Sequence, residues 1–288
     1  MIKTIVINAT AQSADCYPLT ACKPNALMSV FNKTLLEHCL DQLINDDISI
    51  KIVVDAAFSD QFYALELPDY CTIEIDHSYL GSDRFEVIDA SIFRNDTSLF
   101  EINHAWDLLA CSERFAKTII KGDHSEATIE DGVTLKGNVS VGKGTILKRG
   151  TYIEGDVVIG ENCMIGPNCF IRGVSSIGDN ARIGNAVELK NVIIGKNVNV
   201  CHLSYLGDSI VDNDTNLGAG FICSNLRHDG EIIETKLQGK KISTGRNKLG
   251  AIIGQGVHTG VRTTVYPARK IYPFCSTLPS AIVKEDIE

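Results

Sequence analysis

The chain has 288 residues, enough for about two domains that each bury a core of their own. Its 27 Lys and Arg residues against 36 Asp and Glu give a net charge of −9, which argues against nucleic acid or an anionic membrane as a partner. No apolar run reaches the roughly 18 residues of a membrane span, and ten scattered cysteines without a CxxC pair indicate free thiols in a reducing cytoplasm.

The first part of the chain is typical of a small α/β domain. Short β-branched and aliphatic runs predict buried strands at 4–8 and 48–54, and weaker strands near 71–75 and 85–88. Apolar stripes predict helices over 25–44 and 104–120. Strands and helices in this order indicate a sheet that is at least partly parallel. Polar residues then mark a junction with the rest of the chain.

The rest of the chain repeats every six residues. An aliphatic residue holds the same position in eleven consecutive hexads, from Ile129 to Leu189. The phase slips by one residue at Ile194 and again at Val211, and after an interruption the pattern resumes at Ile253. A helix or an alternating strand cannot produce this period, and a β-sandwich would place turns every 8–12 residues. The repeat therefore predicts a solenoid of short parallel strands whose aliphatic side chains point to its axis.

The N-terminal part resembles a known enzyme family in the run VINATAQSADCYPLTACKPNALMSVFNKTLLEHCLDQL. This run is similar to the opening of the sugar-1-phosphate nucleotidylyltransferases, in which a glycine-rich loop cradles the nucleotide phosphates and a lysine follows. Here no glycine lies between Asn8 and Tyr17, and Asn25 occupies the place of the lysine. Backbone amides cannot approach a phosphate closely without those glycines. We expect residues 1–122 to form a truncated nucleotidyltransferase-like domain that serves packing or assembly.

The second part resembles the acetyltransferase domain of the bifunctional N-acetylglucosamine-1-phosphate uridylyltransferases, in their archaeal-type branch. The similar runs are GNAVELKNVIIGKNVNVCHLSYLGDSIVDNDTNLGAGFICSN and TGRNKLGAIIGQGVHTGVRTTVYPARKI. The resemblance implies a mainly β protein in which residues 123–288 form a left-handed parallel β-helix. It also implies a homotrimer with active sites between subunits, and a glucosamine-1-phosphate N-acetyltransferase type of activity that uses acetyl-CoA.

The same resemblance implies roles for nine residues of this sequence. His202 is the general base that deprotonates the acceptor amine, and Asn225 helps to place the amine or the thioester. The implied substrate contacts are Arg172, Lys190, Tyr205, Asn216 and Lys236. The implied coenzyme contacts are Ala219, Asn225 and Gly260. Without the resemblance, a lone histidine is usually structural or at the surface, and the glycines around Ala219 are explained by turn geometry.

Spacing adds physical support for two of the substrate contacts. Arg172 and Lys190 are 18 residues apart, so they stack on one edge of the solenoid if a coil is three hexads long. Two stacked cations suit a phosphate group on a protein that is otherwise acidic. The alternative is a pair of solvated turn charges.

An arm at about 224–250 interrupts the repeat. It carries six Lys and Arg residues against three acids, and we expect a loop or hairpin that reaches a neighbouring subunit. Relatives of the archaeal-type branch carry lysines about where Glu231 and Glu234 fall here. This departure leaves three consequences open: weaker phosphate binding, a different acceptor, or compensation by Lys236.

The sequence thus predicts an acetyltransferase that moves acetyl from acetyl-CoA to the amine of an aminohexose 1-phosphate. No metal is expected, because no cluster of His, Cys and carboxylates has ligand spacing. One alternative is a non-catalytic trimeric scaffold that binds a sugar nucleotide and partners a full-length nucleotidylyltransferase. Glu231 and Glu234 favour this alternative, and it is opposed by His202, Asn225, Arg172 and Lys190. A third possibility, active nucleotidylyl transfer, is opposed by the missing glycine loop.

Overall fold

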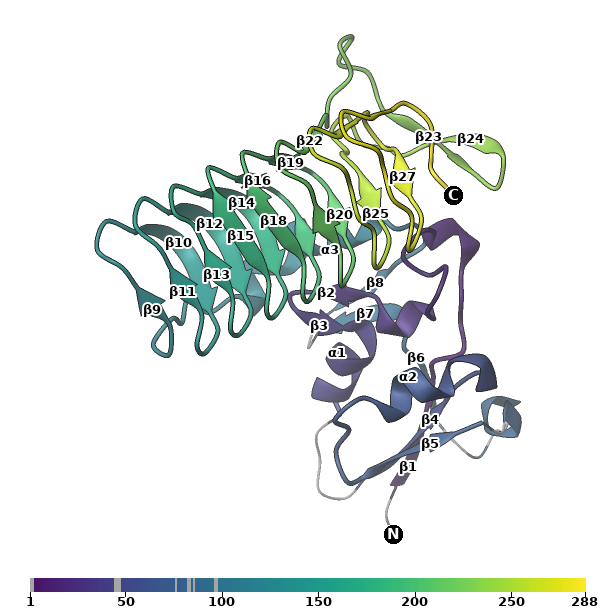
Figure 1. The fold of residues 1–288 in the computed structure, drawn as a ribbon. Coiled ribbons are helices and arrows are strands. Elements are labelled where there is room, and N and C mark those ends of the chain that lie inside the picture. Colours follow the sequence, from purple (N-terminus) through teal and green to yellow (C-terminus); the bar gives the residue numbers. More distant parts are fainter. Residues whose placement is uncertain (1–2, 44–47, 76, 82–83, 85, 96–97) are drawn as a thin grey trace.

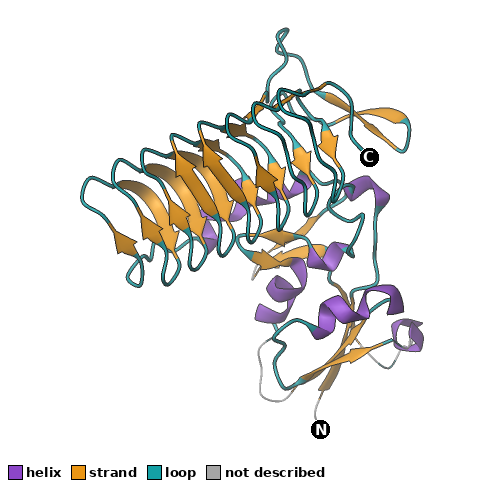
Figure 2. Cartoon of the chain, viewed as in Figure 1, coloured by secondary structure: helices purple, strands orange, loops and turns teal. Residues whose placement is uncertain are grey.

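The computed structural model describes residues 3–43, 48–75, 77–81, 84, 86–95 and 98–288. The longer, C-terminal part is a solenoid of stacked coils, and the N-terminal domain lies beneath its later coils (Figure 1). Strands dominate the chain, and those of the solenoid run parallel from coil to coil (Figure 2). The predicted fold class, a parallel β-helix that follows a small α/β domain, is confirmed.

The solenoid has three faces, each a column of parallel strands. Face A holds β9 (Thr128–Ile129), β11 (Ile146–Leu147), β13 (Met164–Ile165), β15 (Arg182–Asn185), β18 (Asn199–His202) and β21 (Asn216–Leu217). Face B holds the first halves of β10 (Thr134–Val141), β12 (Tyr152–Ile159) and β14 (Phe170–Ile177), then β16 (Glu188–Lys190), β19 (Tyr205–Gly207), β22 (Ile222–Cys223), β26 (Thr264–Val265) and β28 (Ile282–Val283). Face C holds the second halves of β10, β12 and β14, then β17 (Ile193–Ile194), β20 (Ile210–Val211), β25 (Ile252–Ile253) and β27 (Lys270–Ile271).

Strand register explains both the hexad repeat and its phase slips. Thr134 pairs with Tyr152 and Tyr152 with Phe170, so the early coils are 18 residues long, which is three hexads. Glu188 pairs with Tyr205, so this coil has 17 residues and the hexad phase shifts by one. The aliphatic residues of the repeat form a continuous core along the axis, as the sequence predicted, except that Ile129 in the first coil is exposed.

The N-terminal domain contains a parallel four-stranded sheet of order β5-β4-β1-β6. Its strands are β1 (Lys3–Asn8), β4 (Ile48–Val53), β5 (Cys71–Glu74) and β6 (Glu86–Asp89), close to the predicted positions. The helices are α1 (Leu35–Asp41) and α2 (Ser59–Tyr63), with 3-10 turns at Ala14–Cys16, Asn25–Leu27, Ala56–Phe58 and His77–Gly81. Two hairpins complete it, β2 (Ser29–Val30) with β3 (Lys33–Thr34) and β7 (Ile92–Asn95) with β8 (Ser98–Glu101).

The predicted helix over 25–44 is wrong in its first half. The chain forms a 3-10 turn and then the β2–β3 hairpin, whose turn residues Phe31 and Asn32 have φ of 53° and 65°. The helix α1 starts only after Thr34, whose side chain and that of Glu37 form a reciprocal capping box. Two residues of the predicted elements, Ile44 and Phe85, lie outside the described residues.

Helix α3 (Asp107–Ile119) joins the two parts of the protein. It matches the predicted helix and contacts β12 and β14 of the solenoid. A hydrophobic cluster continues from this helix across the outward side of face C; it includes Leu19, Phe93, Leu108, Ile193, Ile210 and Ile252. A buried ion pair of 2.7 Å between Lys23 and Asp212 also crosses this interface. The N-terminal domain is therefore packed firmly onto the solenoid.

The arm is an insertion within one coil, between β22 on face B and β25 on face C, since Ile210 of the preceding coil pairs directly with Ile252. It forms a hairpin of β23 (Glu234–Leu237) and β24 (Lys240–Ser243), and its preceding loop projects away from the solenoid (Figure 1). Leu237 joins the hydrophobic cluster of α3, and Gln238 Nε2 donates to Asp15 Oδ1 at 3.0 Å. Within one chain the hairpin thus packs on its own N-terminal domain; contact with a neighbouring subunit stays a prediction.

Candidate functional site

Face B brings both predicted cations to one edge. Arg172 on β14 pairs in register with Lys190 on β16, and Lys190 pairs with Gly207 on β19. The same register places Glu188 beside Tyr205. The predicted stacking of the two cations is observed, and their side chains lie on adjacent strands.

Each of the two cations already has a carboxylate partner. Arg172 donates from Nε and Nη2 to Glu188 Oε1, at 3.0 and 2.7 Å. Lys190 Nζ lies 2.8 Å from Asp208 Oδ2. A phosphate that binds here would therefore meet a pair of balanced ion pairs, and it would have to share each cation with its carboxylate.

Tyr205 and Asn225 meet above Gly207. A Cβ added at Gly207 would clash with the Tyr205 hydroxyl and would lie 2.6 Å from Asn225 Nδ2. Asn225 Nδ2 also donates to Asp208 Oδ2 at 2.5 Å. Burial, followed by the carboxylates of Glu188 and Asp208, raises the pKa of Tyr205, so its hydroxyl stays protonated and able to donate.

His202 lies at the corner between faces A and B. Its carbonyl oxygen accepts from Gly220 N at 2.9 Å and from Ser204 Oγ at 2.7 Å, which fixes the backbone of the corner. Leu203 follows with φ of 49° and turns the chain toward β19. The residue is exposed, so its imidazole is open to a ligand that lies along this edge. Two residues separate it from Tyr205.

The other predicted contacts are more scattered within one chain. Asn216 belongs to face A, where it follows Asn199 in register. Ala219 lies at the corner of the next coil after His202, and its carbonyl accepts from Arg262 N. A Cβ at Gly218 would lie 2.7 Å from the Gly260 backbone, so close stacking of coils accounts for the glycines here. Their contact with a coenzyme stays a prediction.

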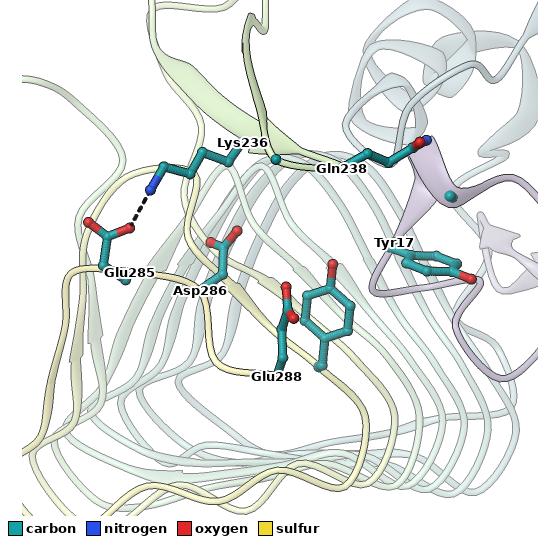
Figure 3. A pocket seen from close by; sticks show the side chains of 9 residues that line it. Tyr17, Lys236, Gln238, Glu285, Asp286 and Glu288 are labelled. Carbon is teal, nitrogen blue, oxygen red and sulfur yellow. Dashed lines mark hydrogen bonds and ion pairs between the residues drawn. The ribbon is translucent and has the colours of Figure 1, made fainter.

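Lys236 lies in the arm hairpin and lines a different hollow, of about 440 Å³. Its Nζ is 3.1 Å from Glu285 Oε2 across this hollow (Figure 3). Asp286 and Glu288 lie on the same wall, opposite Tyr17 and Gln238 (Figure 3). Of the predicted site residues, this hollow contains only Lys236, and its substrate contact stays a prediction.

The loop after β1 is closed by its own side chains. Asn25 Oδ1 accepts from Ser13 N at 2.8 Å, and Thr20 Oγ1 donates to Ser13 O at 2.6 Å. Gln12 Nε2 donates to Thr20 O at 2.7 Å. The loop that would cradle phosphates in a nucleotidylyltransferase is therefore held by contacts within the protein, with Asn25 buried in a structural role.

Comparison with known proteins identifies the relatives of this chain. Residues 153–286 match the family described as the GMPPB C-terminal domain. "Bifunctional protein GlmU" of Methanococcus maripaludis (strain C7) is 48% identical over 188 residues, which cover 65% of this chain and 45% of that protein. The "Bifunctional sugar-1-phosphate nucleotidylyltransferase/acetyltransferase" of Sulfurisphaera tokodaii is 42% identical over 102 residues, 35% of this chain and 25% of that protein. The predicted resemblance is confirmed.

The chain spans less than half of the length of these two relatives. Among solved structures, WeeI from Acinetobacter baumannii AYE aligns over 93% of this chain and 94% of its own, with 16% identity and a TM-score of 0.29. Within the described residues, no helix is long and apolar enough to span a membrane, and no group of three His, Cys, Asp or Glu side chains is arranged to hold a metal ion.

Four residues of this edge were not predicted from the sequence. Glu188 and Asp208 neutralise the two cations, and Asn191 donates to both Glu113 and Asp208. The available signal was positional, because Asn191 and Asp208 replace the glycines of earlier coils at one corner of the solenoid. No sequence pattern indicated the role of Glu113, because its contact with Asn191 depends on how α3 packs against the solenoid.

Proposed function

We propose that this chain transfers acetyl from acetyl-CoA to the amine of an aminohexose 1-phosphate. The observation that supports this most is the gathering of Arg172, Lys190, Tyr205 and Asn225 on one face, with His202 at its adjoining corner. The relative from Sulfurisphaera tokodaii, whose name includes an acetyltransferase, supports the same class of reaction. The acceptor would lie along face B, with its phosphate toward Arg172 and Lys190 and its amine toward His202.

Each group then has a chemical task. His202 takes a proton from the acceptor's ammonium group, and the freed nitrogen attacks the thioester carbonyl carbon. Asn225 donates toward the oxygen on which negative charge develops. The C–S bond breaks as the amide forms. In total the ammonium loses two protons, one of which ends on the thiol of coenzyme A and the other in solvent.

The proposal includes a homotrimer whose active sites lie between subunits. Within a single chain Asn216 lies on face A, whereas Tyr205 lies on face B. Ala219 and Gly260, the proposed coenzyme contacts, lie on later coils than His202. A neighbouring copy that presents face A to face B would bring these groups to one ligand.

The test is acetyl transfer itself. The protein is incubated with acetyl-CoA and a panel of amino-sugar phosphates, and the released thiol is followed. The same sugars with a hydroxyl in place of the amine serve as controls. We expect thiol release with an amino sugar only. In Arg172→Ala the Michaelis constant for the acceptor should rise, because a phosphate contact remote from the amine stabilises substrate and transition state about equally.

Two results count against the proposal. Tight binding of a sugar nucleotide with no thiol release from any acceptor would favour the scaffold alternative. Release of pyrophosphate from UTP and a sugar 1-phosphate would show that the N-terminal domain transfers nucleotides, contrary to what its loop leads us to expect.

A further inference from the structure

The corner between faces B and C changes its chemistry at the proposed acceptor site. In the early coils this corner is formed by Gly137, Gly155 and Gly173, all with positive φ. Asn191 and Asp208 hold the next two places, with φ of 53° and 49°. Asn and Asp are the side chains that best tolerate this left-handed region. Polar groups thus replace glycines where the two predicted cations stack.

These side chains form a hydrogen-bonded ladder centred on Asp208. Asp208 Oδ1 accepts from Asn191 Nδ2 at 2.8 Å, and Oδ2 accepts from Lys190 Nζ at 2.8 Å and from Asn225 Nδ2 at 2.5 Å. Asp208 is only 2% exposed. A buried carboxylate needs such donors to offset its lost hydration, and in return it fixes their positions. Two groups that the proposed reaction uses, Lys190 and Asn225, therefore share one anchor.

The far end of the ladder is held by the N-terminal domain. Asn191 Nδ2 donates to Glu113 Oε1 of α3 at 2.8 Å. Arg246, in the segment of the arm that follows β24, donates to both oxygens of Glu113, at 2.5 and 3.2 Å. Glu113 thus ties α3 to the solenoid corner and to the arm that carries Asn225.

We propose that Asp208 is the positioning residue of the acceptor site and that Glu113 of α3 braces it through Asn191. The proposal rests on the proposed acetyl transfer. It gives the truncated N-terminal domain a task in that reaction: its last helix holds the ladder that aligns Lys190 with Asn225. Asp208 acts through these two residues and not on the substrate.

The first test is Asp208→Asn, in which an amide NH₂ replaces one of two oxygens that face three donors. At least one donor then loses its acceptor. Because hydrogen bonds to charged groups are the stronger kind, we expect kcat/KM for the acceptor to fall roughly 10- to 100-fold. Coenzyme binding should be unchanged. In a Lys190→Ala/Asn225→Ala background, Asp208→Asn should add little further loss, because Asp208 acts through these residues.

The matched control is Asp214→Asn. Asp214 has φ of 59° and accepts from Asn197 Nδ2 and Gln255 Nε2, so it makes the same kind of corner ladder on another edge. Asp214→Asn should leave acetyl transfer at the parent rate. Equal kinetics for Asp208→Asn and the parent, or equal losses in Asp208→Asn and Asp214→Asn, would overturn the proposal.

The second test does not depend on activity. Glu113→Gln should weaken the ion pair with Arg246, whose side chain is 17% exposed. Trypsin should then cleave after Arg246 about fivefold faster, relative to its cleavage after the exposed Lys241. Glu161→Gln, at an exposed carboxylate of an early coil, is the control. No change in this ratio would show that α3 does not brace the arm. If the parent acetylates nothing, the proposed function fails, and this ratio still decides whether the brace exists.

Discussion

An alanine at position 207 tests the arrangement of Tyr205 and Asn225 without removing either side chain. The added Cβ would lie 2.6 Å from Asn225 Nδ2 and in conflict with the Tyr205 hydroxyl. Ordinary contacts are about 3.5 Å or longer, so both groups must move by about 1 Å. Both are ends of flexible side chains, so we expect the fold to survive. A misplacement of about 1 Å at a reacting centre can cost roughly 100-fold in rate, and we expect that loss in kcat.

The assay pairs thiol release with thermal unfolding, and Gly178→Ala is the comparison. A Cβ at Gly178 would lie 2.6 Å from the Gly195 carbonyl carbon, which is backbone and cannot rotate away. Gly178→Ala should therefore lose about 1–3 kcal/mol of stability, whereas Gly207→Ala should lose activity with little change in melting temperature. If Gly207→Ala acetylates as fast as the parent, Tyr205 and Asn225 do not act where we place them. An unfolded Gly207→Ala would contradict the expected side-chain movement.

Two further predictions concern stability. Lys23→Met should lower the free energy of unfolding by about 3–5 kcal/mol, because it leaves Asp212, with a side chain 9% exposed, as an unpaired buried carboxylate. The double variant Lys23→Met/Asp212→Asn should recover most of this loss, as measured by calorimetry. Equal losses in the single and double variants would contradict this. Burial lowers the pKa of His38, so the folded protein holds it neutral while the unfolded chain binds a proton below about pH 6.5. The free energy of unfolding should therefore fall as the pH drops through and below that value. His38→Gln can still donate to the Val30 carbonyl, and its melting temperature should fall less between pH 7.5 and 5 than that of the parent. An identical fall in both proteins would place the acid sensitivity elsewhere.

The repeat made the solenoid predictable because a period of six fixes which side chains face the axis. Even the 17-residue coils were visible, as the slips before Ile194 and Val211. The β2–β3 hairpin was not, because the apolar stripe from Leu27 to Leu43 also suits a helix. Only the capping box of Thr34 and Glu37 marked the true helix start.

Part of the candidate site could likewise be predicted from the sequence, and part could not. The stacking of Arg172 on Lys190 followed from the coil length alone. The pairing of Lys190 with Asp208 did not, because it depends on a left-handed corner at Asp208 that places the carboxylate beside Lys190. The contact with Glu113 depends on how two distant parts of the chain pack, which no local pattern encodes.

The central claim is that His202 is the base of an acetyltransferase, and kcat of His202→Ala tests it most directly. With the acceptor that the panel identifies, we predict a loss of about 10²–10⁴-fold in thiol release, with coenzyme binding and melting temperature unchanged. His258→Ala, at an exposed histidine of a later coil, should retain the parent rate. Acetylation by His202→Ala at the parent rate would contradict the account, and so would an equal loss in His258→Ala.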